Sequence, residues 1–413
     1  MIVSIGDELL LGKATDTNAG WLSQQLGHLG INVAEHLTLG DNLEAISDHL
    51  KQVGAVYEII IASGGLGPTD DDLTRHALAR VLGTELRLHE ESLRCIEGFF
   101  TRLGRDMVDR NRIQAMIPDG CVTMNNAIGT APGIVAKFGK AQAFFLPGVP
   151  REMKQMFNEA VAPTLADTAQ KGKGRQVFVS RTLHTFGIGE SNVAELLGDL
   201  MERGRNPTVN STVSKGIVSL HIHASAANTQ AGVALIEPVA QQLRSLLGSL
   251  VFGEDEDTLA GVVGRVLCER GLTLAAAESC TGGLLAKEIT DAPGASRCFR
   301  CGWVCYSNQA KVSALEVDTD IIGREGAVSE PVARLLAKNA RHLAGSDYGI
   351  GITGIAGPGG GTPEKPVGLV YISLAGRGFC VAHRMLFHGD RAMVRQRAVH
   401  SALDLLRQRL LGQ

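Results

Sequence analysis

Short apolar strands alternate with amphipathic helices along most of this 413-residue chain, and no other feature limits its fold as much. The run Ile2 to Ile5 predicts a first strand, Asp16-Thr-Asn opens a helix, and Glu58 to Ala62 predicts another strand. The same alternation returns after residue 254. A chain with this pattern folds into α/β domains, in which helices cover a parallel sheet.

A different pattern occupies the middle of the chain. The stretch KGKGR (Lys171 to Arg175) is typical of a linker, and the charged run Glu254 to Asp257 indicates a second, solvated boundary. Between them lies a predicted α+β unit, with strands at 176–181, 208–213 and 217–224 and helices at 190–202 and 231–247. We therefore predict three domains, at residues 1–170, 171–253 and 254–413.

Composition argues against several classes of function. Fifty glycines and only 4% aromatic residues favour tight turns and close backbone approach to ligands over aromatic stacking surfaces. A formal net charge of -3 provides no basic field for nucleic acid or an anionic membrane. The sequence shows no basic leader and no apolar run of membrane-spanning length, and its eight cysteines indicate reduced thiols. We expect a cytoplasmic protein.

The stretch AESCTGG (Ala277 to Gly283) is the first candidate for chemistry. It separates a strand pattern from a helix pattern, so it predicts a strand-to-helix turn. Ser279 is either a nucleophile or the N-cap of the helix, and spacing alone favours the N-cap. A nucleophilic serine needs a base, which Lys311 supplies only if burial lowers its pKa; Tyr306 lies nearby in the sequence. Backbone N–H groups at Cys280 to Gly283 could hold an oxyanion.

Cysteines offer two further interpretations of this region. Cys280 is a rival nucleophile, because a thiol at a helix N-terminus has a lowered pKa, and the pattern alone does not separate it from the serine. Cys298, Cys301 and Cys305 lie close together but lack a second pair of zinc ligands at matching spacing. Cys301 and Cys305 share one strand face with Trp303, which favours packing.

The loop GGLGPTDDDLT (Gly64 to Thr74) is a second candidate site. Glycine N–H groups at a strand-to-helix junction suit phosphate, and Asp70, Asp71 and Asp72 suit a hard divalent cation that bridges phosphates. The alternative is an acidic first helical turn, which the helix dipole favours without any ligand. The residues alone favour neither the ligand site nor the acidic helical turn.

A set of motifs in the last domain resembles the nicotinamide mononucleotide amidohydrolase domain of the CinA family, the competence- and damage-inducible proteins. The motifs are AESCTGG, YSNQAK (Tyr306 to Lys311), GAVSEPVA (Gly326 to Ala333), TGIAGPGGG, KPVG and HGDR (His388 to Arg391). The resemblance implies that Ser279 is the nucleophile and that Tyr306 and Lys311 complete the catalytic set.

The same resemblance implies a reaction. Ser279 attacks the carboxamide carbon of nicotinamide mononucleotide, with Lys311 as base and Tyr306 relaying or orienting the proton. Ammonia leaves, and water hydrolyses the acyl-enzyme to nicotinic acid mononucleotide, without a cofactor. The implied substrate-binding residues are Cys280, Thr281, Gly282 and Gly283 in the turn, Thr353, Gly354 and Gly357 in a phosphate-binding loop (Thr353 to Gly361), and Arg391.

The first domain resembles the N-terminal domain of the same family, which has the α/β/α fold of molybdopterin-binding proteins. The motifs are GDELLLG (Gly6 to Gly12), DTN (Asp16 to Asn18), GDN (Gly40 to Asn42), GGLGPTDDDLT, NNAIGTAPG (Asn125 to Gly133) and LPGVPREM (Leu146 to Met153). The resemblance implies a metal-dependent ADP-ribose pyrophosphatase that produces AMP and ribose 5-phosphate by water attack. Molybdopterin binding is the alternative, because the fold is shared.

The resemblance also implies the site residues of this domain. A divalent metal ion is expected, with potassium as a further candidate. The implied metal-site residues are Asp71, Asp72, Asp7 and Glu8, with Asn18 as an additional site residue. The implied phosphate-binding residues are Gly64, Gly65, Gly67 and Thr69.

The middle unit resembles the family's KH-like domain but lacks a GxxG loop, because the nearest stretch, GIGE (Gly187 to Glu190), ends in an acid. RNA binding is therefore not expected. Together the resemblances cover essentially the whole chain and imply a bifunctional pyridine-nucleotide salvage enzyme. It would act on small nucleotides as a homodimer. A non-catalytic competence protein with the same fold is the competing hypothesis.

Overall fold

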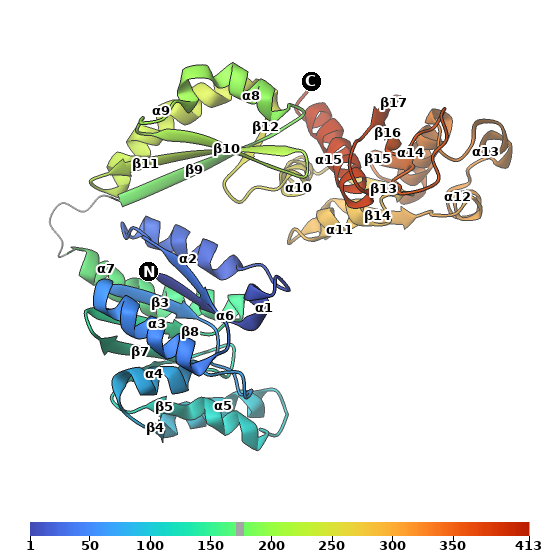
Figure 1. Ribbon diagram of the computed structural model, residues 1–413. Helices are drawn as coiled ribbons and strands as arrows, with labels where there is room; N and C mark the ends of the chain where they lie inside the picture. Colours follow the sequence, from blue (N-terminus) through green and yellow to red (C-terminus); the bar gives the residue numbers. More distant parts are fainter. Residues whose placement is uncertain (171–176, 413) are drawn as a thin grey trace. The chain divides into compact units, whose positions relative to one another are not determined.

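A computed structural model describes residues 1–170 and 177–412, apart from the side chains of residues 167–170. The predicted linker KGKGR lies outside these residues, and the division into three domains stays a prediction. The chain divides into two compact units, residues 1–179 with 225–233, and residues 180–224 with the part from 234 onward. Figure 1 labels the elements of both units. No helix among the described residues combines the length and apolar character that a membrane span requires.

The first unit is built around a six-stranded sheet in the order β2-β1-β3-β8-β7-β6. Its strands are β1 (Ile2–Ile5), β2 (His36–Leu39), β3 (Ile59–Ser63), β6 (Val122–Met124), β7 (Gly133–Phe138) and β8 (Ala141–Leu146). The first three strands and β8 are parallel, as predicted, whereas β7 and β6 continue the sheet in antiparallel pairing. Helices cover both faces, so the central strands are apolar throughout.

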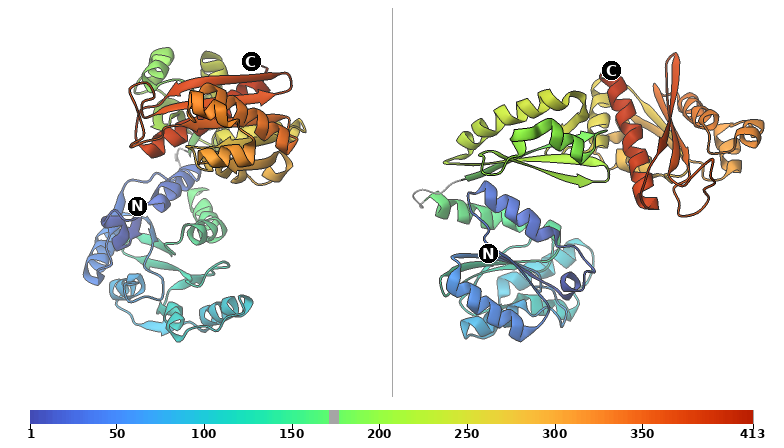
Figure 2. Two further views of the ribbon diagram at one scale, coloured as in Figure 1. Left: turned by 90° about the vertical axis from the view of Figure 1, so that its right-hand side faces the viewer. Right: turned by 45° about the horizontal axis from the view of Figure 1, so that its top comes forward.

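Helices on the two faces give this unit its α/β/α layers (Figures 1 and 2). One core packs the sheet against α3 (Leu43–Val56) and α4 (Thr74–Leu82). The other packs it against α2 (Thr17–His28), α6 (Pro150–Met156), a π-helical turn (Phe157–Val161) and α7 (Ala162–Gln170). The remaining elements are α1 (Asp7–Leu10), β4 (Leu86–Leu88), α5 (Glu90–Arg102), a 3₁₀ helix (Asp109–Ala115) and β5 (Met116–Pro118).

The acidic run of the glycine loop precedes helix α4. This helix begins at Thr74 with Leu73 as its N-cap, and its first turn contains no acidic residue. The interpretation of Asp70, Asp71 and Asp72 as an acidic first turn is therefore wrong, because the helix dipole acts mainly within that turn. Their carboxylates need another explanation.

The middle of the chain forms a four-stranded sheet in the order β10-β11-β9-β12. Its elements are β9 (Val177–Phe186), α8 (Glu190–Leu197), a 3₁₀ helix (Gly198–Met201), β10 (Thr208–Ser214), β11 (Ile217–Ala226), α9 (Thr229–Leu247), another 3₁₀ turn (Gly248–Leu250) and β12 (Val251–Glu254). β12 pairs with β9, so the sheet extends to the predicted boundary. Glu254 there accepts hydrogen bonds from Arg244 Nε (2.7 Å) and Arg181 Nη1 (3.0 Å). The expectation of a solvated charge run is thus wrong at Glu254, because the arginines pair with it.

The last part of the chain forms a five-stranded sheet in the order β14-β13-β15-β16-β17. Its strands are β13 (Leu274–Glu278), β14 (Phe299–Val304), β15 (Tyr348–Gly354), β16 (Leu369–Gly376) and β17 (Phe379–Leu386). The first three are parallel, β16 pairs antiparallel with β15, and β17 pairs antiparallel with β16. Its helices are α10 (Leu259–Glu269), α11 (Leu284–Thr290), α12 (Asn308–Leu315), α13 (Thr319–Glu325), α14 (Glu330–Ala344) and α15 (Arg391–Leu410), with a 3₁₀ turn at Ala295–Arg297. α10, α11 and α15 cover one face, and α12 and α14 cover the other.

The clustered cysteines are separated by this sheet. Cys298 belongs to the core beneath α10 and α15, whereas Cys305 belongs to the core beneath α14, where Trp303 also packs. Cys298 and Cys305 are each only 1% exposed. The packing role predicted for Cys305 is confirmed, because its neighbours are apolar core residues.

Both α/β sheets have a topological switch point at the carboxyl end of their first strand. β1 lies between β2 and β3, and β13 lies between β14 and β15. Successive connections leave such a strand in opposite directions and open a crevice beyond its end, where ligands of α/β proteins bind. GDELLLG follows β1 and AESCTGG follows β13, so each predicted site occupies a switch point.

Candidate active sites

Ser279 follows β13 directly and lies five residues before Leu284, the first residue of helix α11. The N-cap of α11 is Gly283, and Ser279 belongs to the preceding turn, with its N–H bonded to Ile352 O at 3.0 Å. The N-cap interpretation of Ser279 is therefore wrong. Gly282 and Gly283 have φ values of 61° and 88°, in the left-handed region that favours glycine, and their backbone turns the chain from the strand into the helix.

Lys311 meets this serine from helix α12. Its Nζ lies 3.0 Å from Ser279 Oγ and donates to the carbonyl oxygen of Cys305 at 2.9 Å. Lys311 is 1% exposed, and burial lowers its pKa from the ordinary lysine value. A lysine with a lowered pKa is more readily neutral, and only the neutral amine accepts the serine proton. The arrangement has the geometry of a nucleophile and its base.

Cys280 has the opposite character. Its side chain belongs to the apolar core beneath α10 and α11, and burial raises the pKa of its thiol to about 12. A thiol with so high a pKa is protonated near neutral pH and is a weak nucleophile. The structure therefore favours Ser279 over Cys280.

Two buried contacts hold the turn after Ser279. The Glu278 carboxylate accepts hydrogen bonds from the N–H groups of Leu285 (3.0 Å) and Ala286 (2.9 Å), and so caps α11. Arg395 of α15 donates through Nε and Nη2 to the carbonyl oxygen of Thr281, at 3.0 and 2.6 Å. The N–H of Cys280 is the first after Ser279 in this turn. A turn held in this way can direct that N–H toward a developing oxyanion.

Tyr306 lies beside this pair and is not hydrogen-bonded to either member within the described residues. It is 59% exposed, and its hydroxyl accepts a hydrogen bond from Arg391 Nη2 at 2.7 Å. Arg391 also donates to the carbonyl oxygen of Gly357 at 2.8 Å. Tyr306 and Arg391 thus connect the glycine loop to the serine side of the site, and the proton-relay role of Tyr306 stays a prediction.

The first two residues of the predicted phosphate-binding loop are held in place by contacts within the protein. Thr353 is 1% exposed and donates its hydroxyl to the carbonyl oxygen of Ala327 at 2.8 Å. Gly354 is the last residue of β15 and pairs with Val370 of β16. Of the three predicted loop residues, Gly357 is the one that contacts another predicted substrate-binding residue, because its carbonyl oxygen accepts a hydrogen bond from Arg391.

The switch point of the first unit opens into a cavity of about 370 Å³. It joins the end of β1, the loop after β2, the glycine loop and the segment after β8. The lining includes the predicted residues Glu8, Gly64, Gly65, Gly67, Asp71 and Asp72, together with Asp41 and Glu152. Cavities with convergent charged groups of this kind are ordinary ligand sites.

Carboxylates crowd this cavity. Burial, together with the negative charges of Asp7, Glu8 and Asp71, raises the pKa of Asp41. Asp7 turns toward the next loop, where Asp7 Oδ1 accepts from the N–H of Asp41 (3.0 Å) and Asp41 Oδ2 accepts from the N–H of Asp7 (2.9 Å). Crowded like charges are relieved by a cation, so the cavity favours a positively charged ligand on this side.

The three consecutive aspartates point in different directions. Asp72 accepts hydrogen bonds from the N–H of Gly67 (2.8 Å) and from the N–H (2.8 Å) and hydroxyl (2.5 Å) of Thr69, so both its oxygens are used inside the loop. Asp70 pairs with Arg110 on the surface at 2.7 Å. Asp71 lines the cavity. Asp72 lines the cavity as well, and a hydrogen bond with Thr69 lowers the pKa of Asp71. Because Asp72 uses both carboxylate oxygens inside the loop, Asp71 is the stronger candidate for a metal ligand.

Arg75 supports the glycine loop from below. It is 1% exposed and donates to the carbonyl oxygens of Leu66 (2.5 Å) and Gly67 (2.9 Å), and burial lowers its pKa to about 10. The guanidinium remains protonated at neutral pH and places a positive charge under the loop, which favours an anion. Gly64, with φ at 113°, is indispensable above it, because a Cβ there would lie 2.0 Å from the Ile5 carbonyl oxygen.

A divalent metal fits this cavity only with ligands from the substrate. Among the described residues no group of three or more His, Cys, Asp or Glu side chains is arranged to hold a metal ion. Mg²⁺ typically binds through one or two carboxylates, several waters and substrate phosphates. One or two of the carboxylates of Glu8, Asp41 and Asp71 would bind the metal, and the substrate phosphates and water would supply the other ligands. Asn18 lies in an adjoining cavity, where its amide nitrogen donates to Ser63 Oγ (3.0 Å) and Gly148 O (2.8 Å).

Sequence reasoning missed five residues that shape these sites. Glu278, Asp41 and Glu152 lie inside recognised motifs, and their position beside a glycine turn or strand end was an available signal. Arg395 and Arg75 lie in helices outside the recognised glycine loops, and only the folded chain brings them to the carbonyl groups they bind.

Comparison with known proteins agrees with this architecture. Three family models match: Probable molybdopterin binding domain at residues 1–167, Damage-inducible protein CinA KH domain at 180–253, and CinA C-terminal domain at 256–410. A relative from Symbiobacterium thermophilum, named as a competence-damage inducible protein, is 46% identical over 100% of this chain and 98% of its own length. The chain belongs to the CinA family.

A second relative and a solved structure are also similar to this chain. A CinA-like protein of Citrifermentans bemidjiense is 44% identical over 99% of this chain and 97% of its own. A solved structure of a CinA superfamily protein from Klebsiella pneumoniae is 35% identical, covers 38% of this chain and 97% of its own, and has a TM-score of 0.37. The predicted multidomain α/β architecture, with its KH-like middle domain, is confirmed.

Proposed function

We propose that the C-terminal site hydrolyses the carboxamide of nicotinamide mononucleotide to nicotinic acid mononucleotide and ammonia. The observation that carries the proposal is the buried pair in which Lys311 Nζ lies 3.0 Å from Ser279 Oγ. The lowered pKa of Lys311 supports its role as the base. A serine with a neutral amine beside it suits acyl transfer from an amide.

The reaction runs in two steps. Ser279 Oγ bonds to the carboxamide carbon as its proton passes to Lys311 Nζ, and the oxyanion that forms is held by turn N–H groups that include Cys280. The C–N bond then breaks, and the proton on Lys311 passes to the leaving nitrogen, which departs as ammonia. Water attacks the serine ester with Lys311 again as base, and the carboxylic acid product leaves.

The recognition of a nucleotide follows from the groups around this pair. Arg391 reaches the glycine loop and the Tyr306 hydroxyl, and a guanidinium is a suitable partner for the single phosphate of the substrate. The exposed ring of Tyr306 can pack beside the nicotinamide ring. In this proposal Tyr306 orients the substrate.

The test is ammonia release from nicotinamide mononucleotide by the full chain, Ser279→Ala and Cys280→Ala. The proposal predicts activity in the full chain and Cys280→Ala, and its loss in Ser279→Ala. Loss confined to Cys280→Ala would instead assign the reaction to the thiol. Absence of activity in the unmodified chain would favour the non-catalytic competence protein.

A second activity is favoured by the acid-lined cavity of the first unit, which we assign to metal-dependent hydrolysis of ADP-ribose to AMP and ribose 5-phosphate. One or two carboxylates from among Glu8, Asp41 and Asp71 would hold a divalent cation together with substrate phosphates, and the glycine N–H groups of the loop that Arg75 binds would hold phosphate oxygens. When bound, the cation supplies charge neutralisation on the pyrophosphate and an activated water. Potassium remains a candidate second cation.

Cleavage of ADP-ribose, followed as production of AMP and ribose 5-phosphate with Mg²⁺ present, tests this second activity. Molybdopterin binding by residues 1–165 is the alternative, and equilibrium dialysis of that fragment distinguishes it. Binding of molybdopterin without AMP production would replace the pyrophosphatase proposal.

The remaining proposals concern the setting of the two activities. Both substrates are fragments of NAD, so their hydrolysis on one chain suits salvage in the cytoplasm. A homodimer acting on small nucleotides, without nucleic acid or membrane partners, completes the proposal. Sedimentation of the full chain would test the dimer.

A further inference from the structure

Helix α15 joins α11, the helix after the reactive serine, to a hairpin of the middle sheet. Gln396 of α15 donates through Nε2 to Glu288 Oε1 of α11. One helical turn further on, the Nδ1 atom of His400 lies 3.1 Å from the carbonyl oxygen of Lys215, between β10 and β11. Gln396 Nε2 also lies 2.8 Å from His400 Nε2. Lys215, His400, Gln396 and Glu288 thus form a continuous hydrogen-bond line from the hairpin to α11.

The chemistry of these groups gives the line a single direction. Carbonyl and carboxylate oxygens only accept hydrogen bonds, so His400 Nδ1 carries a hydrogen, and the amide nitrogen of Gln396 faces Glu288. The other hydrogen of that amide is donated to His400 Nε2, which accepts it in the neutral ring. His400 is 6% exposed, and burial lowers its pKa from the ordinary histidine value. One neutral tautomer therefore satisfies the whole line.

The hairpin end of the line is rigid. The last residue of β10 pairs with the first residue of β11, so Lys215 and Gly216 form a two-residue turn. Their φ values, 52° and 84°, are both positive, as a type I′ turn requires. The turn lies against α15, because a Cβ on Gly216 would lie 3.5 Å from Arg397 Cγ. The Lys215 carbonyl oxygen is therefore a fixed acceptor for His400.

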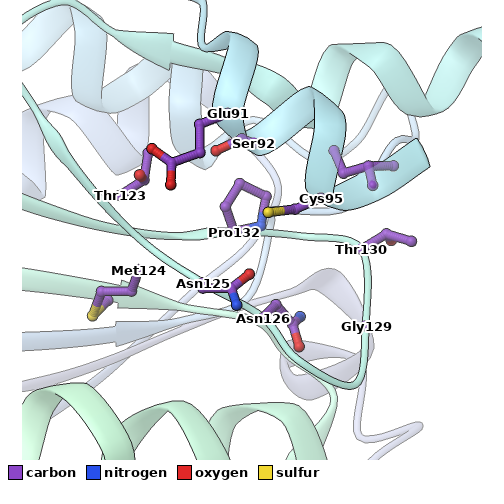
Figure 3. A pocket seen from close by; sticks show the side chains of 11 residues that line it. Glu91, Ser92, Cys95, Thr123, Met124, Asn125, Asn126, Gly129, Thr130 and Pro132 are labelled. Atoms are coloured by element: carbon purple, nitrogen blue, oxygen red, sulfur yellow. The ribbon is translucent and has the colours of Figure 1, made fainter. Parts of the chain in front are cut away.

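The line borders a cavity of about 460 Å³, and all four of its residues belong to the lining. Neither Ser279 nor Lys311 is among the described residues there, so this cavity is separate from the C-terminal site. The cavity in Figure 3, by contrast, shares Thr130 with the acid-lined cavity of the first unit and belongs to that site. Side chains beside a cavity lose packing contacts on that side, so the hydrogen bonds of the line supply the restraint there.

Helix α11 carries this restraint to the serine turn (residues 279–282). Glu288 is the fifth residue of α11, which has only seven residues and follows the turn through its N-cap, Gly283. A helix of two turns has little freedom to bend, so a shift at Glu288 displaces the N–H groups of the turn. Arg395, next to Gln396 on α15, binds the turn directly at Thr281. α15 thus holds the serine turn at two points.

We propose that Gln396 and His400 are positioning residues of the C-terminal site, through which the β10–β11 hairpin holds α11 and the N–H groups of the serine turn. The inference rests on the proposed amidase, because it explains how the groups of that reaction are held. Oxyanion donors act only within a narrow range of distances from the developing charge, so loss of the line lowers kcat more than substrate affinity.

Ammonia release from nicotinamide mononucleotide by the full chain, Gln396→Met and His400→Phe tests this role. Methionine keeps the length of the glutamine side chain, and phenylalanine keeps a ring that packs edge-on against Phe186. We expect kcat to fall roughly ten-fold in Gln396→Met and less in His400→Phe, with KM within about two-fold of the unmodified chain. The double variant should be no slower than Gln396→Met, because both changes break one line.

Gln408→Met is the matched control. Gln408 also lies on α15 and donates through Nε2 to a carboxylate, that of Asp404, at 2.7 Å. It lies roughly three turns beyond Gln396, away from α11. The control should lose thermal stability as Gln396→Met does and keep kcat and KM. An equal loss of kcat in Gln408→Met would assign the effect to general loosening of α15 and overturn the inference.

Modification of Ser279 by a fluorophosphonate separates the inference from the proposed amidase. The serine oxygen bonds to phosphorus, fluoride leaves, and Lys311 takes the proton, so no nicotinamide nucleotide is needed. The rate is followed by the mass of the peptide that contains Ser279. We expect Gln396→Met to slow this modification about ten-fold and Gln408→Met to leave it unchanged.

The outcomes distinguish the two proposals. Slower modification in Gln396→Met, without ammonia release by the unmodified chain, would support the positioning role and reject the amidase. Unchanged kcat and modification in both variants, a change confined to KM, or fully additive losses in the double variant would overturn the positioning role. Absence of both ammonia release and modification in the unmodified chain would overturn both proposals.

Discussion

The two switch points of this chain hold sites of opposite character. At the end of β13 a buried serine and a buried lysine lie 3.0 Å apart, and both partners come from the chain itself. At the end of β1 acidic residues line an open cavity, and burial with neighbouring negative charge raises the pKa of Asp41. The first arrangement has the geometry of a nucleophile and its base, whereas under the proposed function the second would bind a cation and a phosphate.

If the proposed functions hold, one topology supports two kinds of catalysis. The crevice beyond a central parallel strand provides access in both sheets, but the side chains that follow the strand decide what is bound. A Ser with a buried Lys favours covalent chemistry without a metal. Clustered carboxylates beneath glycine N–H groups favour hydrolysis with one.

Removal of divalent metal should separate the two sites most completely. We expect a chelator to abolish AMP production from ADP-ribose and to leave ammonia release from nicotinamide mononucleotide unchanged, because Ser279 and Lys311 need no cation. Both products are measured in the same sample, and Mg²⁺ is then restored. Loss of ammonia release on chelation would contradict the claim that the C-terminal site works without a divalent metal.

Lys311→Met should lower kcat for ammonia release by about 10²–10⁴-fold, the usual contribution of a positioned base. In the unmodified chain, kcat/KM should fall as the pH drops through the lowered pKa of Lys311, because protonation removes the base. A pH series on both proteins measures this. A rate that rises as the pH falls would contradict the assignment.

Asp71→Asn and Asp72→Asn change neighbouring residues of one loop, but we expect the first to lower activity and the second to lower stability. Asp72 binds Gly67 and Thr69, so its replacement should lower the stability of the unit by about 1–3 kcal/mol. Asp71 faces the cavity, so its replacement should weaken metal-dependent hydrolysis with little change in thermal unfolding. If Asp71→Asn and Asp72→Asn have the same melting temperature, Asp72 does not stabilise the loop as we propose.

Tyr306→Phe should have the smallest effect. Its hydroxyl binds Arg391 rather than Ser279 or Lys311, so we expect KM for nicotinamide mononucleotide to rise a few-fold with kcat nearly unchanged. Steady-state kinetics separate the two constants. A hundred-fold loss of kcat would instead support the role of Tyr306 as a proton relay, which the resemblance implies.

Much of the fold was predictable, because strand and helix periodicity is local. The strand at Ile2–Ile5 and the helix after Asp16 follow from apolar spacing and a capping residue. The antiparallel β7 and β6 were not predicted, since strand direction depends on pairing between distant segments. The charged run at Glu254 was misread because the sequence does not show that Arg244 and the distant Arg181 both pair with it.

The sequence predicted which motifs form the sites, but not how their individual side chains are buried and paired. Spacing alone favoured Ser279 as an N-cap, and resemblance favoured the nucleophile; the structure places Gly283 at the cap instead. No sequence pattern shows that Lys311 is buried, or that Asp72 turns into its own loop while Asp71 faces the cavity. Those distinctions arise from tertiary packing.

The most direct test of the account is the mass of the protein stopped in acid during turnover of nicotinamide mononucleotide. We predict an acyl adduct on the peptide that contains Ser279, present in the unmodified chain and in Cys280→Ala, and absent from Ser279→Ala together with all ammonia release. An adduct on Cys280, or continued turnover by Ser279→Ala, would contradict the central claim that a buried lysine activates this serine.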